Sequence, residues 1–320
     1  MSVLDRLPDR RLCLIVNPTA GKGSAKHRLA RLQERLNAAG FLVDVWETKR
    51  RGHATELAQR AVEAGFPLVA VLGGDGTVRE VASALVHTPT VLAILPFGSG
   101  NDLARSLHIP RTIPGASRLL WQRSKVVTID VGIETEGAFY FTLHSALGFA
   151  ADVSHHAAQF RVFQGSAAYF MGVFKALWKM RPIPLQIRLD EEVLRREALF
   201  AMVLNSPYCG GGQWMAPQAN PHDGTLNLVL VDPVSRLELV KTFPRVYSGR
   251  HVEHPAFHLY QAREVVVEPE GSARRIVDGD EIPPGPIRAR VLPGALRVLV
   301  PEDYSLSSLD PSDSEGPEMP

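Results

Sequence analysis

Three short segments of the sequence combine glycines with hydroxyl, amide or carboxylate side chains. They read NPTAG (17–21), GGDGT (73–77) and PFGSGND (96–102). Glycine lets backbone N–H groups approach an anion closely, and Thr77 and Ser99 add hydroxyl donors. Together the three segments have the composition of phosphate-binding loops. For GGDGT taken alone, a tight turn capped by its aspartate is the alternative interpretation.

Each of these segments follows an apolar stretch with the character of a buried strand. The three expected strands before these segments are residues 11–17, 67–73 and 90–96. A further strand at 41–47 and a helix at 53–65 are expected between residues 17 and 67. This alternation predicts an α/β domain with a doubly wound parallel sheet covered on both faces. Because the carboxyl ends of parallel strands lie at one edge of the sheet, we expect the three loops to form a single phosphate-binding edge.

Two widespread phosphate-binding motifs do not account for these loops. The segment NPTAGKG is not a Walker A loop, because no glycine lies five residues before Lys22 and because Gly23, rather than Ser or Thr, follows it. No segment gives GxGxxG in the context of a dinucleotide-binding fold. The edge therefore belongs to another class of phosphate-binding domain.

The pattern changes after residue 132. Short, partly alternating strand-like segments punctuated by Pro and Gly predict a mostly antiparallel β-sandwich, whose last two strands are expected at 287–292 and 295–300. One helical stretch, at 166–180, interrupts these strands. The second half of the chain thus forms a domain of a different architecture from the first.

The length and composition of the chain allow two domains with separate cores. It has 320 residues, of which 45% are hydrophobic. We divide it into an α/β domain (1–130), a β-sandwich domain (131–301) and an acidic tail rich in Pro and Ser (302–320), which we expect to be disordered.

Charge and hydropathy limit the partners of the protein. The formal net charge of +1 argues against a nucleic-acid partner held by bulk electrostatics. No apolar run approaches the roughly 18 residues that a membrane span needs, so no transmembrane segment is expected. The N-terminal MSVLDRLPDRR is too charged for a secretory signal. These features predict a cytoplasmic protein, peripheral at most to the inner face of a membrane.

The motifs taken together resemble those of the diacylglycerol kinase catalytic-domain family, which also includes sphingosine and ceramide kinases and bacterial lipid kinases. NPTAG, GGDGT and PFGSGNDLAR carry the resemblance in the first domain. In the second domain it continues in GFAADV (148–153), GGGQWMAPQANPHDGTLNLVLV (210–231) and VDGDEI (277–282). The resemblance implies an ATP- and Mg²⁺-dependent kinase that binds the nucleotide in the cleft between a nucleotide-binding domain and a domain that holds the lipid and the catalytic base.

The resemblance also assigns residues to the nucleotide site. These are Asn17, Pro18, Thr19, Ala20, Gly21, Thr48, Gly73, Gly74, Asp75, Gly76, Thr77, Val78, Arg79 and Ser99. Most members of the family have threonine at the position of Ser99, and serine keeps the hydroxyl group. Many members have Asn at the position of Arg79, so the role of Arg79 is left open. Asp75 acts either through the nucleotide-bound Mg²⁺ or by holding the glycine loop.

A further motif of the family, DGE, places a carboxylate beside the acceptor hydroxyl. Here it reads Asp278-Gly279-Asp280 and is followed by Glu281. By the motif, Asp280 is the general base, one methylene shorter than the usual Glu, and Asp278 supports the site. Glu281 could substitute only if the strand slipped by one residue, since alternation directs it to the opposite face. An acidic hairpin turn is the alternative interpretation.

The segment QANPHDGTL resembles the structural metal site of bacterial members of the family. The resemblance implies that Asp223 binds Mg²⁺ together with the backbone carbonyls of Asn220 and Thr225. Carboxylate and carbonyl oxygens suit such a hard cation. A simple turn at Asp223-Gly224 is the alternative.

The reaction expected from the resemblance is transfer of the γ-phosphoryl of ATP to a hydroxyl of diacylglycerol or a related lipid, which gives phosphatidic acid or the corresponding phospholipid. The substrate is then a lipid at a membrane surface. For the stretch 160–182, which mixes aromatic and basic residues, we favour a helix packed on the sandwich over a membrane-binding helix. A homodimer through antiparallel edge strands is also expected. Two alternatives remain: a kinase of a soluble substrate, similar to NAD kinases, and a nucleotide-binding regulator without catalysis.

Overall fold

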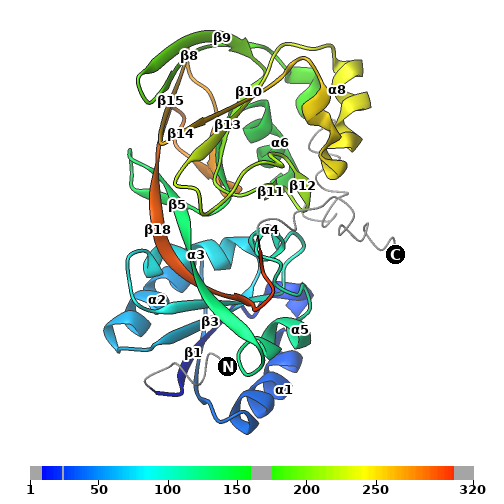
Figure 1. Cartoon of the computed structure of the whole chain (residues 1–320). Helices are drawn as coiled ribbons and strands as arrows, with labels where there is room; N and C mark the ends of the chain where they lie inside the picture. The colour runs from blue at the N-terminus through cyan, green and yellow to red at the C-terminus, as the bar shows by residue number, and fades with distance from the viewer. Residues whose placement is uncertain (1–8, 24, 160–174, 306–320) are drawn as a thin grey trace.

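The computed structural model describes residues 9–23, 25–159 and 175–305 and shows two lobes joined by long strands (Figure 1). The expected helix at 166–180 lies only partly within these ranges, where residues 175–179 are helical. Residues 306–320, most of the expected acidic tail, lie outside the described residues. In the described part of the chain, no helix combines the length and the apolar character that crossing a bilayer requires.

The first lobe contains the predicted parallel sheet. Its strands lie in the order β2-β1-β3-β4 and are β1 (Arg11–Val16), β2 (Leu42–Glu47), β3 (Leu68–Gly73) and β4 (Val91–Pro96). Its helices are η2 (Ala20–Gly23), α1 (Ala25–Ala38), α2 (His53–Glu63), α3 (Asp75–Leu85), α4 (Asp102–Ser106) and α5 (Ile113–Arg118). Helices α1 and α5 lie on one side of the sheet, and α2 and α3 lie on the other (Figure 1). Every residue of β3 and β4 is buried, as expected for strands covered on both faces.

The second lobe is the predicted antiparallel sandwich. One sheet has the order β14-β13-β10-β7-β16-β17, made of β7 (His144–Gly148), β10 (Phe200–Leu204), β13 (Leu226–Val231), β14 (Phe257–Ala262), β16 (Arg275–Val277) and β17 (Asp280–Ile282). The facing strands are β8 (Ile183–Leu189), β9 (Glu192–Ala198) and β15 (Glu264–Pro269). Aliphatic side chains of both sheets, such as Val203 and Val267, form one core between them. A short hairpin consists of β11 (Tyr208–Cys209) and β12 (Gln213–Trp214).

The sandwich carries helices that the sequence did not indicate. They are α6 (Phe149–Gln159), α8 (Arg236–Thr242), η3 (Phe243–Ser248) and η4 (Arg250–Glu253). Side chains such as Phe149, Leu239 and Val246 pack on the outer face of the six-stranded sheet and form a second apolar cluster there. α8, η3 and η4 span only 7, 6 and 4 residues, too few for a helical period to be evident in the sequence.

The two lobes share one continuous strand. β18 (Ile287–Pro301) pairs with β15 in the second lobe, with β4 in the first, and along both with β5 (Ser124–Glu134), which in turn pairs with β6 (Phe139–Phe141). The expectation of two strands at 287–292 and 295–300 is therefore wrong. A bulge between Leu292 and Leu296 accommodates Pro293 and Gly294 without ending the strand. The expected domain boundary at residue 130 falls inside β5 and stays a prediction.

Candidate active site in the cleft between the lobes

The residues expected to bind nucleotide gather at the carboxyl edge of the parallel sheet. Asn17 follows β1, Thr48 follows β2, the segment 73–79 joins β3 to α3, and Ser99 follows β4. Backbone hydrogen bonds align the first residues of these loops along the edge of the sheet, because Thr48 N–H donates to the Val16 carbonyl and Asn17 N–H donates to the Leu72 carbonyl. All fourteen predicted residues thus lie along one edge, whose contact with nucleotide stays a prediction.

Side-chain contacts and close backbone packing order these loops. The amide Nδ2 of Asn17 donates to Thr77 Oγ1 at 3.1 Å, and its Oδ1 accepts the N–H and the hydroxyl of Thr19 at 3.0 and 2.8 Å. Gly74 and Gly98 bring two loops together so closely that a Cβ on Gly98 would lie 2.5 Å from the Gly74 Cα. Glycine is needed at this contact for space, and the loops expose their backbone as a result.

Asp75, the first residue of α3, holds the loop that follows β4. Its Oδ2 accepts the N–H of Asn101 and its Oδ1 accepts the N–H of Asp102, both at 2.7 Å. Burial raises the pKa of Asp75, and these backbone hydrogen bonds oppose the rise. These contacts tie the start of α3 to the loop after β4, and which of its two expected roles Asp75 plays stays a prediction.

Asp102 links the lobes and was not assigned a role from the sequence. Its Oδ2 accepts the N–H of Gly211 at 2.8 Å, and its Oδ1 accepts the N–H of Gly212 at 2.7 Å, so the start of α4 is joined to the hairpin of β11 and β12. Burial and the charge of Asp75 raise the pKa of Asp102 to about 6. The motif PFGSGND includes this residue, but its partners are more than a hundred positions away and leave no local signal.

Asp278 is buried on the opposite side of the cleft. Its Oδ2 accepts the N–H of Thr142 at 2.9 Å, and its Oδ1 accepts the N–H groups of Leu143 and His144 at 3.0 and 2.8 Å. Burial raises its pKa, while these hydrogen bonds and the charge of Arg79 lower it. Both oxygens are occupied by backbone donors, so Asp278 is built to fix the turn that precedes Asp280. This placement is consistent with the supporting role expected of it.

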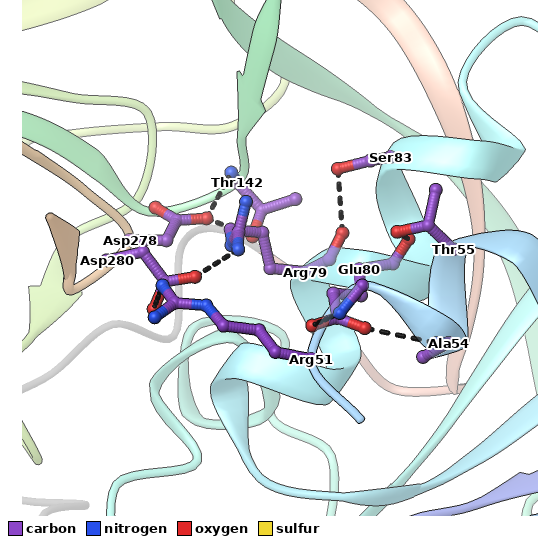
Figure 2. Close-up of polar contacts among 10 residues, drawn as sticks. Arg51, Ala54, Thr55, Arg79, Glu80, Ser83, Thr142, Asp278 and Asp280 are labelled. Atoms are coloured by element: carbon purple, nitrogen blue, oxygen red, sulfur yellow. Dashed lines mark hydrogen bonds and ion pairs between the residues drawn. The ribbon is translucent and has the colours of Figure 1, made fainter. Parts of the chain in front are cut away.

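Asp280 lies between two arginines from the first lobe (Figure 2). Arg79 of α3 contacts its Oδ2 and Arg51, from the loop before α2, contacts its Oδ1. The neighbouring Glu281 instead pairs with Arg274 and with His155, whose Nδ1 lies 2.9 Å from Glu281 Oε2. The hydrogen bond to His155, together with Arg274, lowers the pKa of Glu281. The two acids therefore point to different partners, and of the two only Asp280 pairs with side chains of the first lobe.

A cleft of about 340 Å³ separates the lobes. Its walls include Asp75, Ser99, Gly100 and Asp102 from the first lobe and Leu143, His144, Gly211, Asp278 and Gly279 from the second. A smaller cavity of about 90 Å³, which we call the apolar pocket, lies between the six-stranded sheet and helices α6, α8 and η3. Ala150 and Met202 line both spaces. The polar cleft and the apolar pocket thus share a wall.

His144 lines the cleft beside Asp278 and is 6% exposed. Within the described residues its Nδ1 has no hydrogen-bond partner. Burial lowers the pKa of His144 to about 4, so the imidazole is neutral at physiological pH. The sequence offered no signal for this residue, because a histidine inside an apolar strand has many possible environments.

The candidate metal residues form a turn where β5 and β18 meet. Asp223 Oδ1 accepts the N–H and the hydroxyl of Thr225 at 2.9 and 2.7 Å, and the carbonyl of Asn220 accepts the N–H of Asp223 at 3.4 Å. The buried Asp130 accepts the N–H of Gly224 at 2.7 Å and so fixes this turn. Carboxylate and carbonyl oxygens are ligands of the type that Mg²⁺ prefers, but this turn supplies only one carboxylate. Across the described ranges, no group of three or more His, Cys, Asp or Glu side chains could hold a metal ion.

The fold and the cleft define a two-lobed phosphotransferase. Comparison with known proteins identifies its family: residues 11–133 match the diacylglycerol kinase catalytic domain, and residues 144–300 match the YegS C-terminal NAD kinase beta sandwich-like domain. A diacylglycerol kinase of Mycobacterium tuberculosis (strain ATCC 25618 / H37Rv) is 33% identical over 90% of this chain and 94% of its own length. The chain belongs to the diacylglycerol kinase family, as its motifs indicated.

Other relatives agree with this assignment. A diacylglycerol kinase of Staphylococcus saprophyticus is 29% identical over 85% of this chain and 89% of its own length. Two solved structures of proteins from Bacillus anthracis str. Sterne, both assigned as diacylglycerol kinases, match with TM-scores of 0.79 and 0.73 at 26% and 25% identity. Each covers 93% of this chain and 100% of the solved chain. The predicted fold class is therefore confirmed for both lobes.

Proposed function

We propose that this protein is an ATP-dependent diacylglycerol kinase that forms phosphatidic acid. The observation that carries the proposal is the shared wall of the cleft and the apolar pocket at Ala150 and Met202. A phosphate-binding edge on one side and an apolar cavity on the other fit an acceptor with a hydroxyl head and a hydrocarbon chain. A dinucleotide acceptor, as in the NAD kinase alternative, would leave the apolar pocket without a use.

In the proposed reaction the lipid hydroxyl attacks the γ-phosphorus of ATP. The bond between the lipid oxygen and phosphorus forms, the bond between phosphorus and the β–γ bridging oxygen breaks, and ADP leaves with that electron pair. Asp280 takes the proton of the hydroxyl, a contribution of about 10²–10⁴-fold in rate. The loops at Asn17, Gly73–Thr77 and Ser99 hold the phosphates. Mg²⁺ bound with the nucleotide would neutralise phosphate charge, and the turn at Asp223 is the proposed site for a separate structural ion.

The region around α8 is the proposed contact with the bilayer. Trp178, Leu237 and Val240 are 70%, 65% and 49% exposed, respectively. The Trp178 carbonyl accepts a hydrogen bond from Arg236 at 3.2 Å, which brings the helical residues 175–179 next to α8. Tryptophan and basic residues suit the interface between water and lipid. The buried Ala176 and Leu177 on the same helix also fit the expected packing on the sandwich.

The direct test is phosphoryl transfer from γ-labelled ATP with Mg²⁺ to diacylglycerol, sphingosine and ceramide in mixed micelles, and to NAD. Label in phosphatidic acid is the expected result. Label in another lipid would keep the class and change the acceptor, and label on NAD would place the protein with the soluble-substrate kinases. ATP binding without transfer to any acceptor would support the regulator alternative and contradict the proposal.

A further inference from the structure

Two arginines of the first lobe surround the carboxylate of Asp280. Arg79 contacts one oxygen and Arg51 contacts the other (Figure 2). The side chain of Arg79 is 15% exposed, whereas that of Arg51 is 69% exposed. Asp278 lies close enough to interact with the charge of Arg79, and Glu80 with that of Arg51, so the wider cluster carries no surplus of positive charge. Its distinctive feature is that two guanidinium groups converge on one carboxylate at the edge of the first lobe.

Helix α3 positions both arginines. Arg79 belongs to the helix itself, and its carbonyl accepts the hydroxyl of Ser83 at 2.8 Å. The adjacent Glu80 accepts the N–H of Gly52 at 2.8 Å and the N–H of Ala54 at 3.1 Å, which attaches the loop of Arg51 to the same helix (Figure 2). The two guanidinium groups are therefore held by the helix whose N-terminus forms the GGDG loop.

Arg79 has donors that its ion pair does not use. A guanidinium group carries five N–H donors, and only Nη2 of Arg79 contacts Asp280. Its Nε is buried and has no hydrogen-bond partner within the described residues. Arg79 also lies four residues after Asp75, about 6 Å along the helix from the phosphate-binding N-terminus. A phosphoryl group beyond one bound at that N-terminus would come within reach of these donors.

We propose that Arg79, assisted by Arg51, binds the γ-phosphoryl group of the nucleotide and stabilises the charge on its oxygens during transfer. Guanidinium groups suit this task because they present several fixed donors to phosphate oxygens. The contacts with Asp280 then serve a second purpose, since they aim the base at the hydroxyl that attacks the same phosphorus. The inference rests on the proposed function and gives Arg79 a role that an asparagine could not fill.

The test compares Arg79→Gln and Arg51→Gln with Arg50→Gln as the matched control. Arg50 is adjacent in sequence but pairs with Glu56 in an exposed position. Steady-state kcat and KM are measured with diacylglycerol, and dissociation constants are measured for ADP and for the β,γ-imido analogue of ATP. The comparison of ADP with the analogue reports contacts to the γ-phosphoryl group without requiring turnover.

For Arg79→Gln we expect kcat to fall about 10²–10³-fold, which is the usual effect of removing a hydrogen-bond donor that stabilises negative charge in a transition state. Affinity for the imido analogue should fall roughly 10- to 100-fold, while affinity for ADP stays unchanged. Arg51→Gln should show the same pattern with smaller changes, and Arg50→Gln should match the wild type. Equal losses for ADP and the analogue, or unchanged kcat in Arg79→Gln, would overturn the proposal and leave Arg79 as a counter-ion.

The outcome also separates this inference from the proposed function. If the wild type phosphorylates no lipid but Arg79→Gln still loses selectivity for the imido analogue over ADP, the acceptor assignment fails and the γ-phosphoryl contact stands. If the wild type phosphorylates diacylglycerol and the arginine variants do so at the same rate, the acceptor assignment stands and the proposed role of the arginines fails.

Discussion

Asp75 and Asp102 are connected in series across the cleft. Oδ1 of Asp75 accepts the backbone N–H of Asp102 at 2.7 Å, and the carboxylate of Asp102 accepts the N–H groups of Gly211 and Gly212 in the other lobe. The start of α3, the start of α4 and the β11–β12 hairpin thus form one unit. Because both carboxylates accept hydrogen bonds from the backbone of neighbouring segments, their side chains fix the shape of the cleft; Asp102 is also paired with Arg105, whose Nε lies 3.9 Å from its Oδ1.

Replacement of Asp102 by Ala should loosen this unit. Two N–H groups of the second lobe would lose their acceptor, and because Gly211 is exposed and Gly212 is half-buried, the cost is about 0.5–1.5 kcal/mol for each hydrogen bond. We expect a lower free energy of unfolding in urea and a higher KM for ATP, since the loop at Ser99 and Gly100 adjoins Asp102. Glu63→Ala, at an exposed position at the end of α2, is the control. Wild-type stability in Asp102→Ala would show that the bridge is not needed.

The contact between Gly74 and Gly98 gives a second prediction. A Cβ at Gly98 would lie 2.5 Å from the Gly74 Cα, a distance that requires the backbone to move. Gly98→Ala should separate the two phosphate-binding loops, at a cost of about 1–3 kcal/mol in stability, and weaken ATP binding. Glu63→Ala, at an exposed position at the end of α2 and outside the predicted nucleotide site, is the control. Calorimetric ATP titrations that give equal affinities for the two variants would contradict this explanation.

His144 makes the stability of the fold depend on pH. Burial lowers the pKa of His144 from the ordinary 6.5 to about 4, so the unfolded chain takes up a proton in this range that the folded chain does not accept. The contribution of His144 to the free energy of unfolding should therefore be highest above pH 6.5 and fall by roughly 3 kcal/mol as the pH falls to about 4, while Asp102, whose pKa is raised to about 6, contributes with the opposite sign. In urea titrations at several pH values, the free energy of unfolding of His144→Asn should fall less than that of the wild type between pH 6.5 and about 4.

The matched control for this slope is His87→Asn. His87 is exposed and its backbone has a φ of 58°, a conformation that asparagine tolerates. We expect this variant to keep the wild-type pH dependence. A slope that is unchanged in His144→Asn, or that is lost in His87→Asn, would assign the titration to other groups.

The parts of the site that the sequence predicted follow from local rules. A parallel sheet places the carboxyl ends of its strands at one edge, so the positions of Asn17, Gly74 and Ser99 could be predicted from the strands alone. Alternation along β17 likewise predicted that Asp280 and Glu281 face different partners, as their ion pairs confirm.

The parts that the sequence did not predict depend on contacts between distant segments. Arg51 and Asp280 are more than two hundred positions apart, and so are Arg79 and Asp280. From the sequence, Asp102 has the character of an ordinary first residue of a helix, because its hydrogen-bond partners belong to the other lobe. Pro293 and Gly294 suggested a break, but the bulge keeps β18 intact because Asp130 accepts the N–H of Gly294 at 2.7 Å.

The junction of the cleft with the apolar pocket predicts a change in acceptor selectivity. Ala150 of α6 lines both spaces, so Ala150→Trp should fill the region where they adjoin. We expect kcat/KM for a long-chain diacylglycerol to fall much more than kcat/KM for the dioctanoyl form, with KM for ATP unchanged. The short-chain substrate serves as the internal control. Equal losses for both substrates would mean that the acyl chain does not enter the apolar pocket.

The role of Asp280 is tested by the rate of phosphatidic acid formation by Asp280→Asn and Glu281→Gln compared with that of the wild type. Asparagine keeps the size of the side chain but cannot take the proton of the lipid hydroxyl, so Asp280→Asn should lower kcat by about 10²–10⁴-fold. Glu281 pairs with Arg274 and His155, and Glu281→Gln should retain most of the activity. If Asp280→Asn forms phosphatidic acid at the wild-type rate, Asp280 is not the general base, and if the wild type forms none, the protein is not a diacylglycerol kinase.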